Sequence, residues 1–315
     1  MKIPDYSDVL SAADRIKPYI NTTPILHSSA INRFAGCEIF FKCENFQKVG
    51  AFKFRGASNA VWSLSDEEAQ KGVATHSSGN HAQALALAAR MRGIPATIVM
   101  PNNSPQVKKD AVAGYGADIV YCEPTLQARE STLQKVLDDK GCIFIHPYDN
   151  YYVIAGQGTA SMELLNEIPS LDVLITPVGG GGLLSGSSIS AKALSPNIKV
   201  IAAEPEGADD AHRSFYSGEI VPSTNPKTIC DGLLTSLSER TFAIIKKNVN
   251  EIVTVSDEFT IKAMKMIWER MKIIIEPSSA VTLGMILEKK IDLTGQKIGI
   301  IISGGNVDLN KLPWN

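Results

Sequence analysis

Nine short apolar runs recur along the whole chain, and segments of helical length separate most of them. Most of these runs are continuous rather than alternating, a pattern typical of strands that are buried on both faces. Because strand-like and helix-like segments alternate, the sequence predicts an α/β fold with parallel sheets flanked by helices. The runs are 39–44, 72–77, 96–101, 117–122, 142–147, 172–179, 199–205, 251–256 and 297–304.

Two of the intervening helices have clear end signals. The segment 80–92 is rich in alanine and leucine and is followed by Gly93, a typical C-terminal cap. Ser256 precedes Asp257 and Glu258 at the expected start of another helix, where acidic side chains suit the helix dipole.

The chain of 315 residues is long enough for about two domains. The four runs between 72 and 147 predict a compact βαβα block, so the later runs must pair among themselves and with a strand near the N-terminus. We therefore expect a small domain, 66–149, inserted into a large domain formed by 1–65 and 150–315. A cleft between two such domains is a usual place for a small-molecule site.

Composition argues against several protein classes. The 31 Lys and Arg residues face 33 Asp and Glu residues, whereas a nucleic-acid-binding protein usually shows a basic surplus. Asp5 and Asp8 interrupt any signal-peptide core, and no uncharged apolar run reaches the roughly 18 residues of a membrane span. The five cysteines form no C-x-x-C pair, which predicts buried thiols in a reducing compartment. We expect a cytoplasmic protein that acts on a small molecule.

Four consecutive glycines, Gly179–Gly182, follow one strand run directly and precede a helix expected near Leu183. Residues without Cβ let backbone N–H groups approach an anion closely, and a helix N-terminus adds unpaired donors. The sequence therefore predicts a phosphate site, with a tight turn that binds nothing as the alternative. The glycines fit no G-x-G-x-x-G frame, but Glu204 at the end of the next run keeps an NAD-dependent dehydrogenase as a remote alternative.

Three further segments carry polar or reactive groups. In GAFKFRGA (50–57), Lys53 lies between two phenylalanines, which favours a lowered pKa and an amine able to form a Schiff base, with a surface lysine on an amphipathic segment as the alternative. In THSSGNHAQ (75–83), hydroxyl and amide groups at a helix start could hold a substrate carboxylate, or simply cap the helix through Ser78 or Asn80. In ISGGN (302–306), Ser303 begins a glycine-rich turn.

Eight motifs in this order resemble the pyridoxal-phosphate enzymes of the serine racemase and serine/threonine dehydratase family. The resemblance covers essentially the whole chain. It implies fold type II, the two-domain architecture of the tryptophan synthase β-like group, with pyridoxal phosphate between the domains. The motifs are KCENFQKVGAFKFRGA, THSSGNHAQ, VIAGQGT, TPVGGGGLLSG, AAEPEGADD, ICDGL, MKIIIEP and ISGGNVDL.

The resemblance also implies roles for single residues. Lys53 would bond covalently to the cofactor, with Phe52 beneath it. Asn80 would bind the pyridine 3-oxygen, and Ser303 would face the ring nitrogen. The phosphate would be held by Gly179, Gly180, Gly181 and Gly182, and the substrate carboxylate by Ser77, Ser78, Asn80 and His81.

Ser78 favours racemisation among the activities of this family. The resemblance implies that Lys53 exchanges the α-proton on one face of the cofactor and Ser78 on the other, whereas related threonine dehydratases typically have alanine there. We therefore expect interconversion of L- and D-serine, with an accompanying dehydratase (ammonia-lyase) activity that gives pyruvate and ammonia. The alternative is an ammonia-lyase for L-threonine, L-serine or threo-3-hydroxyaspartate, because Tyr148, Leu234 and Thr235 depart from the animal racemases. A non-catalytic amino-acid sensor is disfavoured by the intact site.

The resemblance further implies a divalent cation, an effector and a partner. Glu204, Asp210 and the carbonyl of Ala208 would bind Mg²⁺, Ca²⁺ or Mn²⁺, with a solvated acidic loop as the alternative. Animal relatives bind ATP at a dimer interface, so a homodimer and activation by ATP are expectations. Val49 departs from this pattern, because a threonine is expected there. The matching ATP positions are Ser28, Ser29, Lys48, Gln83, Tyr115, Lys272 and Asn306.

Overall fold

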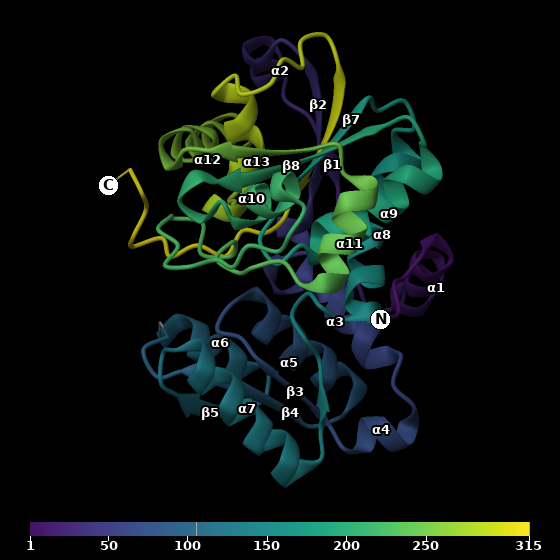
Figure 1. Ribbon diagram of the computed structural model, residues 1–315, viewed down its shortest axis with the longest axis vertical. Coiled ribbons are helices and arrows are strands. Elements are labelled where there is room, and N and C mark those ends of the chain that lie inside the picture. The colour runs from purple at the N-terminus through teal and green to yellow at the C-terminus, as the bar shows by residue number, and fades with distance from the viewer. Residues whose placement is uncertain (105, 315) are drawn as a thin grey trace.

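The computed structural model describes residues 1–104 and 106–314, which form two β-sheets flanked by helices (Figure 1). This arrangement confirms the predicted α/β class. Its strands are β1 (Ile25–Leu26), β2 (Glu38–Cys43), β3 (Val73–His76), β4 (Ala96–Pro101), β5 (Asp118–Cys122), β6 (Ile143–Phe144), β7 (Val173–Pro177), β8 (Lys199–Pro205), β9 (Glu251–Val255) and β10 (Lys297–Ile302).

The two sheets differ in size and order. The larger has six strands in the order β1-β2-β10-β7-β8-β9, and the smaller has four in the order β5-β4-β3-β6. The early strand β2 pairs with the last strand β10, as the sequence required. Strands β3–β6 thus form one sheet, and β1, β2 and β7–β10 form the other. The domain boundaries near 65 and 150 stay a prediction.

Two features of the sheets correct the sequence-based expectations. The pairing is parallel except at β1, which runs antiparallel to β2; a two-residue strand shows no periodicity and was not predicted. The run 142–147 was expected to be a strand throughout, but β6 covers only Ile143–Phe144. The chain turns away because Nδ1 of His146 accepts hydrogen bonds from the backbone N–H groups of Tyr148 and Asp149.

Helices cover both faces of the sheets. Those before and within the smaller sheet are α1 (Tyr6–Ile16), α2 (Ser29–Ala35), α3 (Lys53–Trp62), α4 (Asp66–Gln70), α5 (Asn80–Arg92), α6 (Gln106–Gly114) and α7 (Leu126–Lys140). Those after it are α8 (Tyr151–Glu167), α9 (Gly182–Leu194), α10 (Asp210–Ser217), α11 (Glu239–Asn248), α12 (Asp257–Met271) and α13 (Pro277–Leu287). Short 3-10 helices are η1 (Glu44–Phe46), η2 (Lys48–Gly50) and η3 (Glu206–Ala208).

The continuous apolar runs are explained by burial on both faces of the larger sheet. On β10, Ile300 belongs to the core cluster that contains α12 and α13, whereas Ile301 belongs to the cluster that contains α8 and α9. Adjacent residues of a strand point to opposite faces, so both must be apolar here. The five cysteines are free and buried, as predicted.

The helix ends bear out one prediction and overturn another. Helix α5 spans the predicted residues and ends at Gly93, which has a φ of 73°. The alternative that Ser78 or Asn80 only caps the helix is wrong, because Gly79 is the N-cap and no side chain caps the helix. The Asn80 side chain instead donates to the carboxyl group of Glu276, the N-cap residue of α13.

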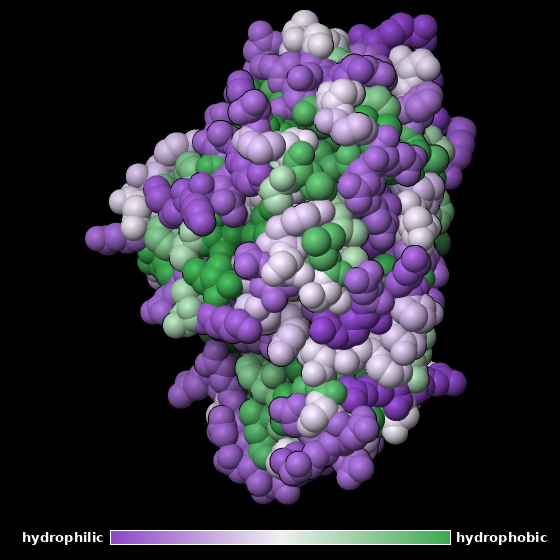
Figure 2. Space-filling model, turned by 90° about the vertical axis from the view of Figure 1, so that its right-hand side faces the viewer, coloured by the Kyte–Doolittle hydropathy of each residue, from purple (hydrophilic) through white to green (hydrophobic). Residues whose placement is uncertain are grey.

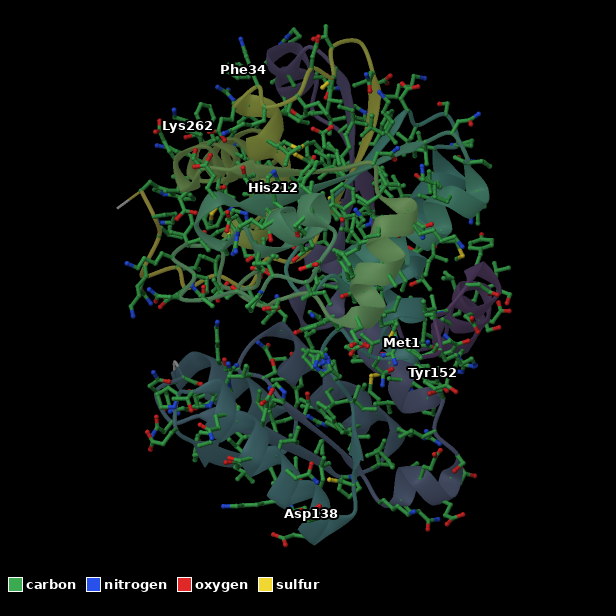
Figure 3. All side chains as sticks on the ribbon, in the orientation of Figure 1. Met1, Phe34, Asp138, Tyr152, His212 and Lys262 are labelled. Atoms are coloured by element: carbon green, nitrogen blue, oxygen red, sulfur yellow. The ribbon has the colours of Figure 1, made fainter. Side chains whose placement is uncertain are left out.

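Helix α3 lies between the two halves of the molecule, because it packs against both α5 and α8. Phe34 and Lys262 mark one end of the molecule and Asp138 the other (Figure 3). In the space-filling view, the outline is indented on its left side between the upper and lower parts (Figure 2). No helix within the described residues is long and apolar enough to cross a membrane.

Candidate active site

The glycine loop supplies a row of unpaired backbone donors at the carboxyl end of β7. Gly179–Leu184 are all buried, yet within the described residues none of their N–H groups donates a hydrogen bond. Gly181 has a φ of 85°, and a Cβ on Gly180 would lie 2.4 Å from the Tyr148 ring. Buried donors without acceptors are costly, so the loop fits an anion such as a phosphate group.

Lys53 begins α3, and its amine reaches the segment 147–148, which also contacts the glycine loop. Its Nζ donates to the carbonyl oxygen of Pro147 at 2.9 Å and lies 5.2 Å from the centre of the Phe52 ring. Burial lowers the pKa of Lys53 to about 8, and the carboxyl group of Glu276 opposes part of that shift. A large fraction of the amine is therefore neutral near pH 8, as a nucleophile or base requires.

Ser303 lies buried at the end of β10, beside the start of α3. Its carbonyl oxygen accepts a hydrogen bond from the Phe52 N–H at 2.9 Å. Its hydroxyl is 2.8 Å from the hydroxyl of Ser279, which also bonds both backbone groups of Gly304. Ser279 was not found from the sequence, because nothing along the chain links the start of α13 to the turn after β10.

Asn80, Glu276 and Asn306 form a hydrogen-bonded network that joins the start of α5 to the N-cap of α13. The Nδ2 of Asn80 lies 3.0 Å from Oε1 and 3.1 Å from Oε2 of Glu276, and its Oδ1 accepts from Asn306 Nδ2 at 2.9 Å. Burial and the charge of Asp231 raise the pKa of Glu276 to about 7. Glu276 is a second residue that sequence reasoning missed; its only signal was its place before Pro277 at a helix start.

The serine turn lies between β3 and α5. The Ser77 hydroxyl accepts a hydrogen bond from the Gly79 N–H at 3.3 Å, and Ser78 is half-buried on the same turn. His81 places Nε2 3.1 Å from the Ile145 carbonyl oxygen, and burial lowers its pKa to about 3. His81 is therefore neutral at physiological pH and packs as a core residue.

A group of basic side chains adjoins the serine turn. The rings of His76 and His146 lie 6.2 Å apart. Burial lowers the pKa of His76, and the nearby charge of Arg129 lowers it further. The Nε of Arg129 is buried and has no hydrogen-bond partner among the described residues.

The expected cation site contains two buried carboxyl groups. Glu204, at the end of β8, accepts from the N–H groups of Ala211 at 2.8 Å and His212 at 2.7 Å. Both carboxyl oxygens of Asp210 are buried without a partner among the described residues. Burial raises the pKa of Glu204 to about 9 and that of Asp210 to about 6. Ala208, in η3, is also buried.

The seven residues expected at an ATP site fall into two groups. One group lies around η2 and α5, where Asn306 also binds the carbonyl oxygen of Val49 at 2.7 Å. The other lies at the start of α2 and at the C-cap of α12, two helices that contact each other. The first group contains Lys48, Gln83, Tyr115 and Asn306, and the second contains Ser28, Ser29 and Lys272.

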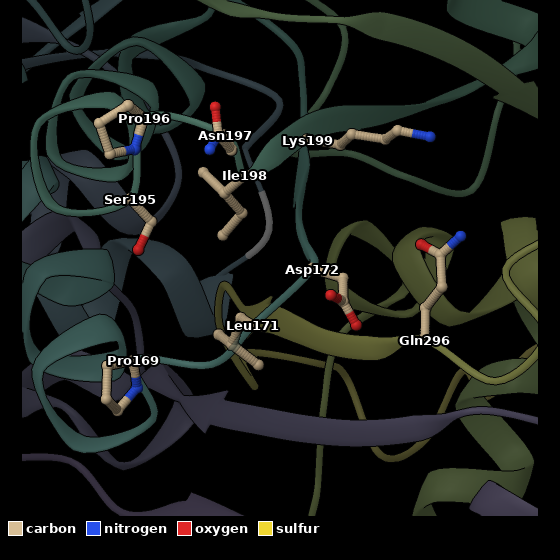
Figure 4. A pocket seen from close by; sticks show the side chains of 9 residues that line it. All are labelled: Pro169, Leu171, Asp172, Ser195, Pro196, Asn197, Ile198, Lys199 and Gln296. Carbon is tan, nitrogen blue, oxygen red and sulfur yellow. The ribbon is translucent and has the colours of Figure 1, made fainter.

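A separate hollow lies at the other edge of the larger sheet (Figure 4). It is lined by residues at the amino ends of β7, β8 and β10, among them Asp172, Lys199 and Gln296. In parallel sheets, small-molecule sites form at the carboxyl ends of the strands. The glycine loop and Ser303 lie at those carboxyl ends, so this hollow is not part of the candidate site.

Comparisons with known proteins agree with this geometry. The family model described as "Pyridoxal-phosphate dependent enzyme" matches residues 16–304. A beta-hydroxyaspartate dehydratase of Paracoccus denitrificans is 52% identical over 100% of both chains. A serine racemase of Dictyostelium discoideum is 55% identical over 97% of this chain and 95% of its own. The crystal structure of serine racemase from Dictyostelium discoideum has a TM-score of 0.93 and covers 97% of this chain and 99% of that one. The chain therefore belongs to the family of pyridoxal-phosphate dependent enzymes.

Proposed function

We propose that this enzyme interconverts L- and D-serine and also dehydrates serine to pyruvate and ammonia. One observation supports the proposal: the Lys53 amine bonds to Pro147, the glycine loop with its unpaired donors packs on the adjacent Tyr148, and α3 packs on α5, the helix that follows the serine turn. The high identity to a serine racemase supports it.

The residues at the site fit pyridoxal phosphate. The unpaired N–H groups of Gly179–Leu184 would hold its phosphate, Lys53 would bond to it, and Ser303 would face its ring nitrogen. When bound, the cofactor supplies the electron sink that acidifies the α-proton of an amino acid. Asn80 would exchange part of its bonding to Glu276 for the cofactor's ring oxygen.

Lys53 and Ser78 divide the proton chemistry in this proposal. The Lys53 amine, with its pKa of about 8, can take the α-proton when neutral and return it when charged. Ser78 delivers or removes the proton on the other face, and Ser77 with the start of α5 holds the substrate carboxylate. Loss of the β-hydroxyl after the α-proton leaves gives dehydration.

A chiral product assay with L-serine tests the proposal. Ser78→Ala is expected to abolish D-serine formation while keeping pyruvate formation, because only the second proton donor is lost. Ser77→Ala is the matched control on the same turn, and it is expected to weaken substrate binding for both products equally. Equal loss of both products in Ser78→Ala contradicts the two-face mechanism.

A second candidate function is ammonia-lyase activity on threo-3-hydroxyaspartate. The buried, unpartnered Nε of Arg129 beside His76 suits a second substrate carboxylate, and a relative of 52% identity is a beta-hydroxyaspartate dehydratase. Arg129→Met is expected to raise KM for hydroxyaspartate by about tenfold or more while changing KM for serine little. Equal KM changes for both substrates would remove this candidate.

A divalent cation, ATP and a second subunit complete the proposal. Within the described residues, no three His, Cys, Asp or Glu side chains are grouped to hold a metal, so the cation would bind Glu204, Asp210, the Ala208 carbonyl and water. The unpaired oxygens of Asp210 support this ligand set. The two groups of ATP-site residues suit a nucleotide bound between two copies of a homodimer. We place the enzyme in the cytoplasm.

A further inference from the structure

Four charged side chains that the proposed chemistry does not use are buried together beside α3. Arg55 and Glu44 are fully buried, Lys42 is 1% exposed and Glu163 is 22% exposed. They come from β2, η1, α3 and α8, so they join elements that are far apart in the sequence. We call Lys42, Glu44, Arg55 and Glu163 the charge quartet.

The guanidinium group of Arg55 is the centre of the charge quartet. Its Nε donates to Glu44 Oε2 at 2.7 Å, and its Nη2 donates to Glu44 Oε1 at 2.9 Å. Its Nη1 and Nη2 also donate to the two carboxylate oxygens of Glu163, at 2.6 and 2.8 Å. Arg55 is thus bound in the two-point mode by two carboxylates at once, which fixes its plane.

The outer contacts complete the hydrogen bonding. Lys42 Nζ donates to Glu163 Oε2 at 2.6 Å and to the Thr23 carbonyl oxygen at 2.7 Å. The Thr23 hydroxyl donates to Glu44 Oε1 at 2.6 Å, and Arg55 Nη1 reaches the Thr159 hydroxyl at 3.2 Å. Buried ion pairs of this kind often stabilise a fold no better than apolar side chains of the same volume. Stability alone is therefore a weak reason for the charge quartet.

The place of the charge quartet suggests another reason. Arg55 follows Lys53 by two residues in the first turn of α3. On the other side of Lys53, the Phe52 N–H is fixed to the Ser303 carbonyl oxygen. The helix also packs tightly on α8, since a Cβ on Gly156 would lie 2.7 Å from the Arg55 carbonyl oxygen. The backbone of Lys53 is thus held on both sides.

We propose that Arg55, through the charge quartet, is a positioning residue. It holds the Lys53 amine where that amine would react with the cofactor, and it adds no net charge beside it. Two cations and two carboxylates cancel, so the titration of Lys53 is left to burial and to the titratable groups that face it. Those groups are Glu276, His81 and His146. The proposal rests on the assignment of Lys53 as the cofactor-binding lysine.

The first test measures how fast the Lys53 amine condenses with the aldehyde of pyridoxal phosphate, a step that forms one C–N linkage and releases one water. Visible absorbance follows this loading in the cofactor-free full chain. Arg55→Lys keeps the positive charge but loses the bidentate hydrogen bonds of the guanidinium group. We expect loading to slow by about a hundredfold, because a misplacement near 1 Å has about that effect on a rate. The kcat for L-serine should fall similarly, with KM little changed.

The matched control is Arg92→Lys. Arg92, on α5, donates to the carbonyl oxygens of Val61, near the C-terminus of α3, and of Leu64, just after that helix. This variant loosens α3 away from Lys53, so its loading rate should stay within about twofold of wild type. Circular dichroism at the assay temperature selects the conditions under which every variant is folded.

A second test separates positioning from general loosening by the sign of the charge left behind. Glu44→Gln leaves one uncancelled positive charge, which lowers the pKa of Lys53 and shifts the pH of half-maximal loading downward. Arg55→Met leaves one uncancelled negative charge and shifts that pH upward. A purely structural role predicts no shift, or shifts in one direction.

The outcomes separate this proposal from the proposed function. If Lys53→Ala loads as wild type does, the assignment of Lys53 fails and the proposed function fails with it. If wild type loads through Lys53 but Arg55→Lys loads within twofold of it, the positioning proposal alone is overturned. Shifts of the same sign in Glu44→Gln and Arg55→Met overturn it as well.

Discussion

Two groups of buried charged side chains behave in opposite ways in this molecule. In the charge quartet, burial alone would raise the pKa of Glu163, but the bonds from Arg55 outweigh it and hold that pKa low. At Glu204 and Asp210, no cationic side chain of the described residues forms an ion pair with the carboxyl groups, and burial raises their pKa values to about 9 and about 6. The first group is complete within the chain, whereas the second is suited to a ligand that supplies positive charge.

The largest effect is expected when Arg55 is removed from the charge quartet. Arg55→Met leaves the buried carboxylates of Glu44 and Glu163 without their main partner, which is expected to lower the free energy of unfolding by about 3–5 kcal/mol. Urea unfolding followed by circular dichroism measures this change. A loss below about 1 kcal/mol would mean that the carboxylates do not depend on Arg55.

The second effect is expected when a cation binds Glu204 and Asp210. Mg²⁺ at a hundred times its dissociation constant is expected to raise the free energy of unfolding by about 2.7 kcal/mol, because the cation binds only the folded site. Asp210→Asn should remove that gain. Asp209→Asn is the matched control, since Asp209 is half-exposed and pairs with Arg213. Equal Mg²⁺ gains in Asp210→Asn and wild type would refute the ligand set.

The third effect is a pH dependence that differs between the groups. Glu204 and Asp210 have folded-state pKa values above their unfolded values of 4.5 and 3.8, so protonation stabilises the cation-free fold. That contribution is complete below about pH 4 and is lost as pH rises through about 6 and then about 9. The lowered pKa of Glu163 acts in reverse, since its contribution is lost as pH falls.

Thermal melts across this pH range, with and without Mg²⁺, measure the third effect. Without the cation, the melting temperature should decline between pH 6 and pH 9, and saturating Mg²⁺ should flatten that decline because both carboxyl groups are then ionised and bound. A decline of the same slope in both series would contradict the account.

The smallest effect is expected at an exposed ion pair. Lys262 and Glu258 lie four residues apart on α12, with side chains 52% and 71% exposed. Lys262→Met should change the free energy of unfolding by about 0.5 kcal/mol or less, because water screens the pair. A larger loss, in the same urea titration, would show that exposure does not set the difference between the ion pairs.

Local signals made part of the site predictable from the sequence. Four glycines at a strand end and a lysine between phenylalanines are unusual over a few residues, and in the structure both contact the segment 147–148. The continuous strand runs indicate burial on both faces, which the packing of Ile300 and Ile301 explains.

The missed features depend on contacts between distant parts of the chain. Asn80 and Glu276 are 196 residues apart, and Arg55 and Glu163 are 108 apart. No periodicity or turn signal relates such positions in one sequence. Asn80 also shows why the capping alternative is wrong: a residue type that commonly caps helices donates here to a buried carboxyl group from another element.

The most direct test of the account is to find which lysine carries the cofactor. The protein loaded with pyridoxal phosphate is reduced with borohydride and digested, and the peptides are weighed by mass spectrometry. The account predicts that the added mass lies on Lys53 alone, in the peptide that also contains Phe52. Label on another lysine, or on none, would contradict it.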